Sequence, residues 1–166
     1  ARTGRVVHRI LQTLPEVPEE QRLSYAERGL RRNALNEAVA QRLIAIVEDP
    51  GNAALFAAGS EAEVSIGTRL PDGTPLTGTI DRLAVGPREV LIVDYKSDAT
   101  PSPLNAQSAH VRQLASYCFA LQKIHPENLI KAGILWTGAA RLEWVNPAEI
   151  HKALAQFAAA GTATKA

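Results

Sequence analysis

The apolar run Val90-Leu91-Ile92-Val93 constrains the fold of this chain more than any other feature of the sequence. Successive side chains of a strand point to opposite faces, so four consecutive apolar residues make both faces of this strand apolar. Such a strand lies inside a sheet and is covered on both sides. The run therefore predicts a layered domain built around a central strand from Glu89 to Tyr95.

The segment from Glu61 to Tyr95 has a hydrophobic period of two, which is typical of strands. We predict strands at 63–66, 76–85 and 89–95, because turn residues separate these three segments. The turns are Pro71-Asp72-Gly73 and Gly86-Pro87. Strands joined by such short turns form an antiparallel meander.

Helical periodicity dominates the chain before and after this meander. A short helix is expected within 18–33 and a turn at 48–52. Two apolar stripes flank that short helix, and their members are Val6, Val7, Ile10, Leu11 and Leu14, and Leu35, Val39, Leu43, Ile46 and Val47. After the meander we expect a helix at 107–123, a buried strand at 130–137, a short strand at 141–145 and a closing helix at 147–158. The buried face of the first of these helices would carry Val111, Leu114, Ala115, Cys118 and Leu121.

The length of 166 residues suits one domain. We interpret 1–166 as a single unit with a helical part at 1–58, a core at 61–158 and a tail at 159–166. No apolar run approaches the roughly 20 residues that cross a bilayer, and the first residues do not resemble a secretory signal. We therefore expect a cytoplasmic protein without a membrane partner.

The composition excludes some chemistries and leaves the substrate open. Cys118 is the one cysteine of the sequence, so this chain is not expected to build a disulfide framework, a cysteine-rich zinc site or an iron–sulfur cluster. The formal net charge is +1, so no overall basic field indicates nucleic-acid binding. A near-neutral domain is expected to bind a polyanion weakly by itself.

The segment GTIDRLAVGPREVLIVDYKSD carries the most informative side chains. Asp81 lies on the second predicted strand and Asp94 at the end of the third, and a hairpin closing at Gly86-Pro87 can bring them side by side. Alternation puts Asp94 and Lys96 on one face of their strand, with Tyr95 turned the other way. Two carboxylates and an ammonium group should therefore meet at one edge of the sheet.

Paired carboxylates in a partly buried place are unfavourable unless a cation neutralises them. Mg²⁺ or Mn²⁺ suits oxygen ligands and binds phosphate oxygens, so a phosphodiester hydrolase is the favoured function. Lys96 would orient the attacking water or stabilise developing negative charge. The alternative is a surface salt bridge from Lys96 to Asp94 or Asp81 without catalysis.

These motifs resemble those of the RecB-like nucleases of the PD-(D/E)XK superfamily. The resemblance rests on G-T-I-D-R at 78–82, D-Y-K-S at 94–97 and Q-L-A-S-Y at 113–117. With G-R-V-V-H at 4–8, A-E-V at 62–64 and L-W-T at 135–137, it is greatest to the C-terminal nuclease domain of alphaproteobacterial AddA helicase–nuclease subunits. It implies an α/β, restriction-endonuclease-like core with a central mixed sheet flanked by helices and an N-terminal helical segment.

The resemblance also implies roles for individual residues. Asp81 and Asp94 would be acidic metal ligands, the carbonyl of Tyr95 a further ligand, Lys96 the catalytic lysine, and His8 the residue that completes the metal site. Gln113 and Tyr117 match the helix motif beside the site and would contact the substrate. Ser97 stands where threonine is commoner.

Three of these assignments have alternatives that the residues alone leave open. His8 could be a core or boundary histidine. Gln113 and Tyr117 could form a helix edge with a buried ring and a hydrogen-bonded hydroxyl. Glu63 could be a carboxylate that contacts the metal ligands without binding the metal itself, or an exposed strand residue.

The function expected from the sequence is Mg²⁺-dependent DNA cleavage, of exonuclease type and on single strands, with Mn²⁺ able to substitute. The resemblance implies repair of double-strand breaks together with a helicase portion of the same polypeptide and an AddB-like partner subunit. Because the sequence begins at the nuclease motifs, it would be a fragment or a small stand-alone relative. The alternative is an inactive nuclease-fold module that binds DNA or a subunit.

Overall fold

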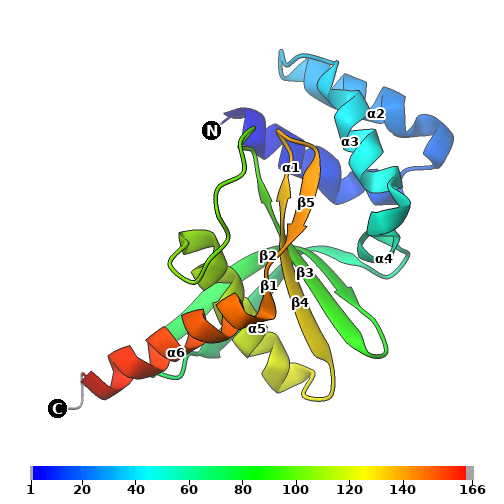
Figure 1. Ribbon diagram of the computed structural model, residues 1–166. Coiled ribbons are helices and arrows are strands. Elements are labelled where there is room, and N and C mark those ends of the chain that lie inside the picture. Colours follow the sequence, from blue (N-terminus) through cyan, green and yellow to red (C-terminus); the bar gives the residue numbers. More distant parts are fainter. Residues whose placement is uncertain (1, 164–166) are drawn as a thin grey trace.

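The computed structural model describes residues 2–163, and Figure 1 shows a sheet with helices on both sides. In the N-terminal part the elements are α1 (Arg2–Thr13), η1 (Leu14–Glu16), α2 (Glu19–Arg32), α3 (Val39–Glu48), η2 (Pro50–Asn52) and α4 (Ala53–Phe56). The remaining elements are β1 (Glu61–Arg69), β2 (Pro75–Val85), β3 (Glu89–Lys96), α5 (Ala109–Ile124), β4 (Leu129–Trp136), β5 (Arg141–Trp144) and α6 (Pro147–Ala163).

The five strands form one mixed sheet in the order β1-β2-β3-β4-β5. The predicted antiparallel meander of β1, β2 and β3 is confirmed, and β5 is antiparallel to β4. β3 and β4 are parallel, because α5 lies between them in the chain and returns it to the starting edge. The expected central position of β3 is confirmed, as is the mixed α/β sheet flanked by helices.

The two apolar faces of β3 belong to two different cores. Val90 and Ile92 pack in the core under α5 and α6, whereas Leu91 and Val93 pack in the core under the N-terminal helices. In Figure 1, α1 to α4 gather on one side of the sheet and α5 and α6 on the other. The four-residue apolar run therefore joins both layers through one strand.

The helical stripes bury most of the residues that the periodicity selected. Leu35, the first residue of the second predicted stripe, instead precedes α3, which begins at Val39, and both side chains are half-buried. Val6, Val7, Ile10 and Leu11 are buried on α1, and the predicted apolar face of α5 is buried as well. The closing helix α6 extends beyond its predicted end at Ala158 to Ala163, in a segment rich in alanine, the best helix former. Residues 159–163 of the predicted tail are thus helical, and 164–166 lie outside the described residues. No helix in the range 2–163 combines the length and apolar character needed to cross a membrane.

Gly78 lets α5 pack closely on β2. A Cβ atom at this position would lie 2.5 Å from the hydroxyl oxygen and 2.8 Å from a ring carbon of Tyr117. The Tyr117 ring is buried in the core beneath α5 and α6 and has no room to retreat. The first residue of the G-T-I-D-R motif is therefore a packing requirement of this interface.

We predict that Gly78→Ala destabilises the protein by about 1–3 kcal/mol, the usual cost of overpacking a core. Gly67→Ala is the matched control, because Gly67 lies on the paired strand β1 and a Cβ there would be 3.7 Å from the backbone oxygen of Leu76, an ordinary van der Waals distance. Urea unfolding measures both free energies. Equal stability of the two variants would contradict the proposed contact with Tyr117.

Candidate metal centre

Asp81 occupies the point where the hydrogen-bonded ladder between β2 and β3 ends. The last paired residues are Arg82 and Val93, and continuing that register would put Asp81 opposite Asp94. The Asp81 Oδ2 atom instead accepts a hydrogen bond from the backbone N–H of Tyr95, at 2.6 Å. The side chain of Asp81 thus takes the place of a main-chain acceptor, which holds its carboxylate at the end of β3.

The environment of Asp81 opposes negative charge. Burial raises the pKa of its carboxyl group to about 7, and the hydrogen bond from Tyr95 offsets only part of that rise. The nearby carboxyl groups of Asp94 and Glu63 contribute to the same rise in pKa. A bound cation would reverse the balance, because it favours the charged form of each carboxylate.

Asp94 and Lys96 lie together on one face of β3, as the alternation of the strand predicts. Lys96 Nζ is 2.6 Å from Asp94 Oδ2, and Asp94 is 7% exposed. Apart from this ion pair, the buried Oδ2 atom has no hydrogen-bond partner among the described residues. A buried carboxylate oxygen in that condition has capacity for a further cationic neighbour.

His8 reaches the same place from α1. Its Nε2 atom lies 3.0 Å from the backbone carbonyl oxygen of Tyr95, and its Nδ1 atom lies 3.9 Å from Asp81 Oδ1. The ring also meets the Tyr95 ring edge to face, at 5.4 Å between centroids. These contacts place α1 against the end of β3, and whether His8 binds metal stays a prediction.

Glu63 belongs to this cluster, which the sequence left undecided. The pairs Ala62–Arg82 and Val64–Ile80 place it opposite Asp81 across β1 and β2. Its backbone has a φ of 54°, a left-handed conformation that costs a non-glycine residue about 1–2 kcal/mol. Ligand atoms of His8, Glu63 and Asp81 all lie within 4.8 Å of one another. The sequence alone could have indicated Glu63 only through the alignment of β1 with β2, which places Glu63 opposite Asp81.

Arg82, the next residue after Asp81, is a second contributor that sequence reasoning missed. It is 1% exposed, and its Nη2 atom donates to the carbonyl oxygens of Leu11 at 2.9 Å and Gln12 at 3.1 Å. Its Nε atom contacts the Tyr95 hydroxyl at 3.4 Å. Arg82 therefore joins the end of the helix that carries His8 to the strand that carries Asp81.

Gln113 and Tyr117 lie on α5, on the opposite side of the sheet from α1. Gln113 Nε2 donates to the Tyr117 hydroxyl at 3.1 Å, and Tyr117 is 4% exposed. This arrangement matches the alternative of a buried ring with a hydrogen-bonded hydroxyl. The ring supports β2 at Gly78, and substrate contact by Gln113 or Tyr117 stays a prediction.

The donor set around Asp81 fits a divalent cation. Its grouped ligand atoms come from His8, Glu63 and Asp81, and the Tyr95 carbonyl oxygen lies 3.0 Å from His8. Asp94 lies beside Asp81 but outside this group, with its Oδ2 atom paired to Lys96. Oxygen donors suit Mg²⁺ and Mn²⁺, and adjacent ligands at about 2.1 Å from such an ion lie about 3 Å apart. His8 Nε2 donates a hydrogen bond to the Tyr95 carbonyl oxygen at 3.0 Å, and a cation could take the place of that proton.

The fold and the site together define a restriction-endonuclease-like protein with an acidic, lysine-containing strand edge. The chain belongs to the PD-(D/E)XK nuclease superfamily, whose model matches residues 1–163. A comparison with curated proteins found no match. Members of this superfamily are generally metal-dependent nucleases that use Mg²⁺ or Mn²⁺, so the family indicates nuclease activity.

We predict that Asp81 makes the stability of the protein pH-dependent when divalent ions are chelated. A carboxyl pKa raised from 3.8 to about 7 contributes stability that is complete below the lower value and lost as the pH rises through the upper one. Between about pH 5 and pH 8 the wild type should therefore lose more unfolding free energy than Asp81→Asn. Urea unfolding in EDTA measures the difference.

Asp72→Asn is the control for this experiment. Asp72 lies in the turn between β1 and β2, and the backbone N–H of Thr74 lowers its carboxyl pKa, so its titration lies below this pH window. Its pH dependence should match that of the wild type. Identical pH dependence of Asp81→Asn and the wild type would show that Asp81 is not held in an unfavourable environment.

We also predict that His8→Ala weakens Mn²⁺ binding by about tenfold or more. Even substitution of a residue that only contacts a metal ligand typically lowers metal affinity by about 10–100-fold. Glu63→Gln should weaken it too. The control is Glu61→Gln, which removes one charge two residues away on β1. Isothermal titration with Mn²⁺ gives the affinities. Unchanged affinity of His8→Ala would make His8 a packing residue.

Proposed function

We propose that this protein is a Mg²⁺-dependent deoxyribonuclease that hydrolyses phosphodiester bonds, with Mn²⁺ able to replace Mg²⁺. One observation carries the proposal: His8, Asp81, Asp94 and Lys96 converge from three separate elements on the end of β3. A module that only bound DNA or a subunit would not need two largely buried carboxylates beside a lysine, because that grouping is costly without a cation.

The residues divide the chemical work. Asp81, Asp94 and the Tyr95 carbonyl would hold the cation with His8, and Glu63 would add a carboxylate from β1. When bound, the cation supplies Lewis-acid polarisation of the phosphate and lowers the pKa of a water. Lys96 lies within reach of Asp94 and would orient the attacking water or stabilise charge on the phosphate oxygens.

The substrate and context that we propose are single-stranded DNA, exonucleolytic cleavage and repair of double-strand breaks by recombination. Their support is the resemblance of the three motifs to RecB-like nucleases and to AddA subunits. A helicase portion of the same polypeptide and an AddB-like subunit would then deliver the strand. Such delivery raises the effective concentration of substrate for a domain whose formal charge is only +1.

The second candidate is an inactive nuclease-fold module that binds DNA or docks a subunit. The close Lys96–Asp94 ion pair is the observation that favours it, because the pair could serve packing alone. Cleavage assays separate the two candidates, since the inactive module binds without hydrolysis at any metal concentration.

We predict that Asp94→Ala and Lys96→Ala each reduce Mg²⁺-dependent cleavage of single-stranded DNA by about 10²-fold or more, as loss of one charge-stabilising group does. Asp72→Ala and Lys152→Ala are the controls, because they remove charges of the same sign from places outside the candidate metal centre. Single-turnover cleavage of an end-labelled oligonucleotide, with circular dichroism to verify folding, measures the effect. Wild-type rates in folded Asp94→Ala would refute the mechanism.

A further inference from the structure

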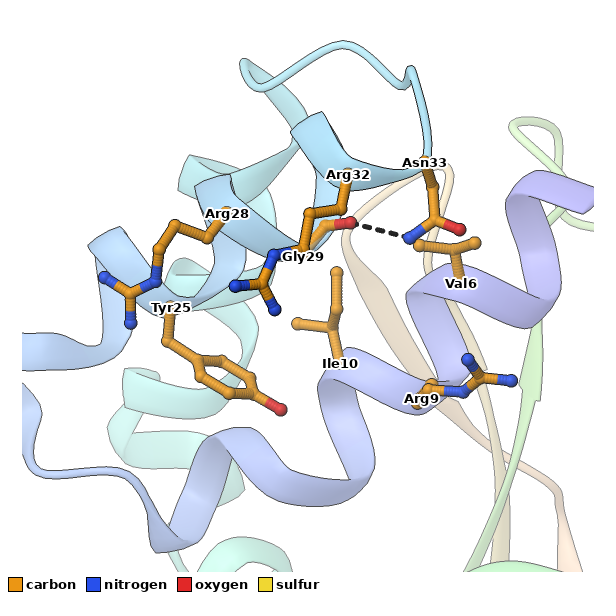
Figure 2. A pocket seen from close by; sticks show the side chains of 8 residues that line it. All are labelled: Val6, Arg9, Ile10, Tyr25, Arg28, Gly29, Arg32 and Asn33. Atoms are coloured by element: carbon orange, nitrogen blue, oxygen red, sulfur yellow. Dashed lines mark hydrogen bonds between the residues drawn. The ribbon is translucent and has the colours of Figure 1, made fainter.

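A pocket lined by three arginines lies between α1 and α2, outside the candidate metal centre. Its volume is about 410 Å³. Figure 2 shows Arg32 on α2 near the centre of the view, whereas the guanidinium groups of Arg28 on α2 and Arg9 on α1 extend to opposite sides of it. Its apolar wall consists of Val6, Ile10 and the Tyr25 ring. The pocket thus combines a cationic rim with an apolar wall.

The arginines of this pocket are not used by the fold as ion pairs. On the same helix, Arg22 pairs with Glu48 and Arg31 with Glu37. Arg9, Arg28 and Arg32, in contrast, form no ion pair within residues 2–163. Arg28 makes a 3.3 Å hydrogen bond to Ser24 Oγ, which leaves its charge uncompensated. Three unpaired cations spread along one surface are suited to a ligand with several negative charges.

The depth of the pocket depends on a close approach of the two helices. A Cβ atom on Gly29 would lie 3.0 Å from Cδ1 of Ile10, so a larger residue there would press on the pocket wall. Asn33 continues the wall and holds its side chain by donating to the Gly29 carbonyl, at 2.8 Å. The site is therefore shaped by packed residues, and its charges are supplied by exposed ones.

Helix α1 connects the pocket to the metal centre. His8 faces Tyr95 and Asp81, whereas the next residue, Arg9, lines the pocket with Val6 and Ile10. The two places therefore lie on neighbouring sides of one helix, because successive residues of an α-helix point about 100° apart.

We infer that this pocket binds the phosphate backbone of the nucleic-acid strand that the metal centre cleaves. The spread guanidinium groups contact successive phosphates, and the apolar wall with Tyr25 contacts an adjoining sugar or base. The inference rests on the proposed nuclease function, because it takes the ligand to be the strand that reaches Asp81 and Asp94. It adds a positioning site that leaves the hydrolytic residues unchanged.

The first measurement is binding without cleavage. Fluorescence anisotropy of a labelled single-stranded oligonucleotide in EDTA, over a series of salt concentrations, compares the wild type with Arg9→Gln, Arg28→Gln and Arg32→Gln. Each variant should bind about fivefold more weakly. The slope of log affinity against log salt should become shallower by about 0.7 for each phosphate of a single strand that the variant no longer neutralises.

The matched control is Arg88→Gln, which removes the same charge at the β2–β3 turn, at the opposite end of β3 from Asp94. Affinities and salt slopes of the three pocket variants equal to those of this control would overturn the inference. Weakened binding of a polyglutamate peptide with unchanged DNA binding would identify a protein-docking surface and would also overturn it.

The second measurement separates this inference from the proposed function. Bis(p-nitrophenyl) phosphate is a small diester that cannot reach from the metal centre to the pocket. The pocket variants should hydrolyse it at the wild-type rate with Mn²⁺ while cleaving the oligonucleotide more slowly. Equal losses on both substrates would show that the arginines act through the metal centre and would overturn the pocket.

Failure of the proposed function has a different signature. A wild type that binds the oligonucleotide but hydrolyses neither substrate would refute the nuclease proposal, and the anisotropy series would still decide whether the arginines hold the strand. A wild type that binds no oligonucleotide at low salt would refute the pocket.

Discussion

The buried guanidinium of Arg82 is the interaction on which the candidate site depends. It is enclosed between α1 and the sheet, and its charge faces carbonyl oxygens of Leu11 and Gln12 at the C-terminal end of α1, where the helix dipole is negative. Phe56 lies under the guanidinium, at 5.5 Å from its ring centroid. These contacts set the position of α1 on the sheet, and His8, one turn before Leu11, reaches Tyr95 because of it.

The candidate metal centre illustrates how a strand edge concentrates charge. Backbone pairing between β2 and β3 stops at Arg82 and Val93. Beyond that point the Asp81 carboxylate accepts the hydrogen bond from the Tyr95 N–H. Asp81 is stabilised there by the Tyr95 N–H but disfavoured by burial and by its acidic neighbours. The fold therefore keeps a partly buried cluster of carboxyl groups, and a bound cation would stabilise their charged forms. Superfamily membership supplies the same interpretation from independent evidence.

The arginine pocket and the metal centre share α1 but differ in their physical basis. The metal centre consists of buried or half-buried groups held by hydrogen bonds, together with the exposed Glu63. The pocket has exposed guanidinium groups over a packed floor. Hydrolytic chemistry requires the first kind of environment, because preorganised charges act most strongly away from water. Holding a polyanion requires only the second, which suits a protein whose formal net charge is +1.

The sequence by itself determined the central strand, both hairpins, the helical stripes and the trio Asp81, Asp94 and Lys96, because alternation and turn chemistry are local properties. The parallel pairing of β3 with β4, the place of Glu63 opposite Asp81 and the buried role of Arg82 came only from the tertiary structure. Glu63 is exposed, and its backbone departs from the strand region, so no period marks it. Arg82 reads as a surface charge until the carbonyls of a helix 70 residues away enclose it. Such long-range contacts are decided by packing, which a local pattern does not encode.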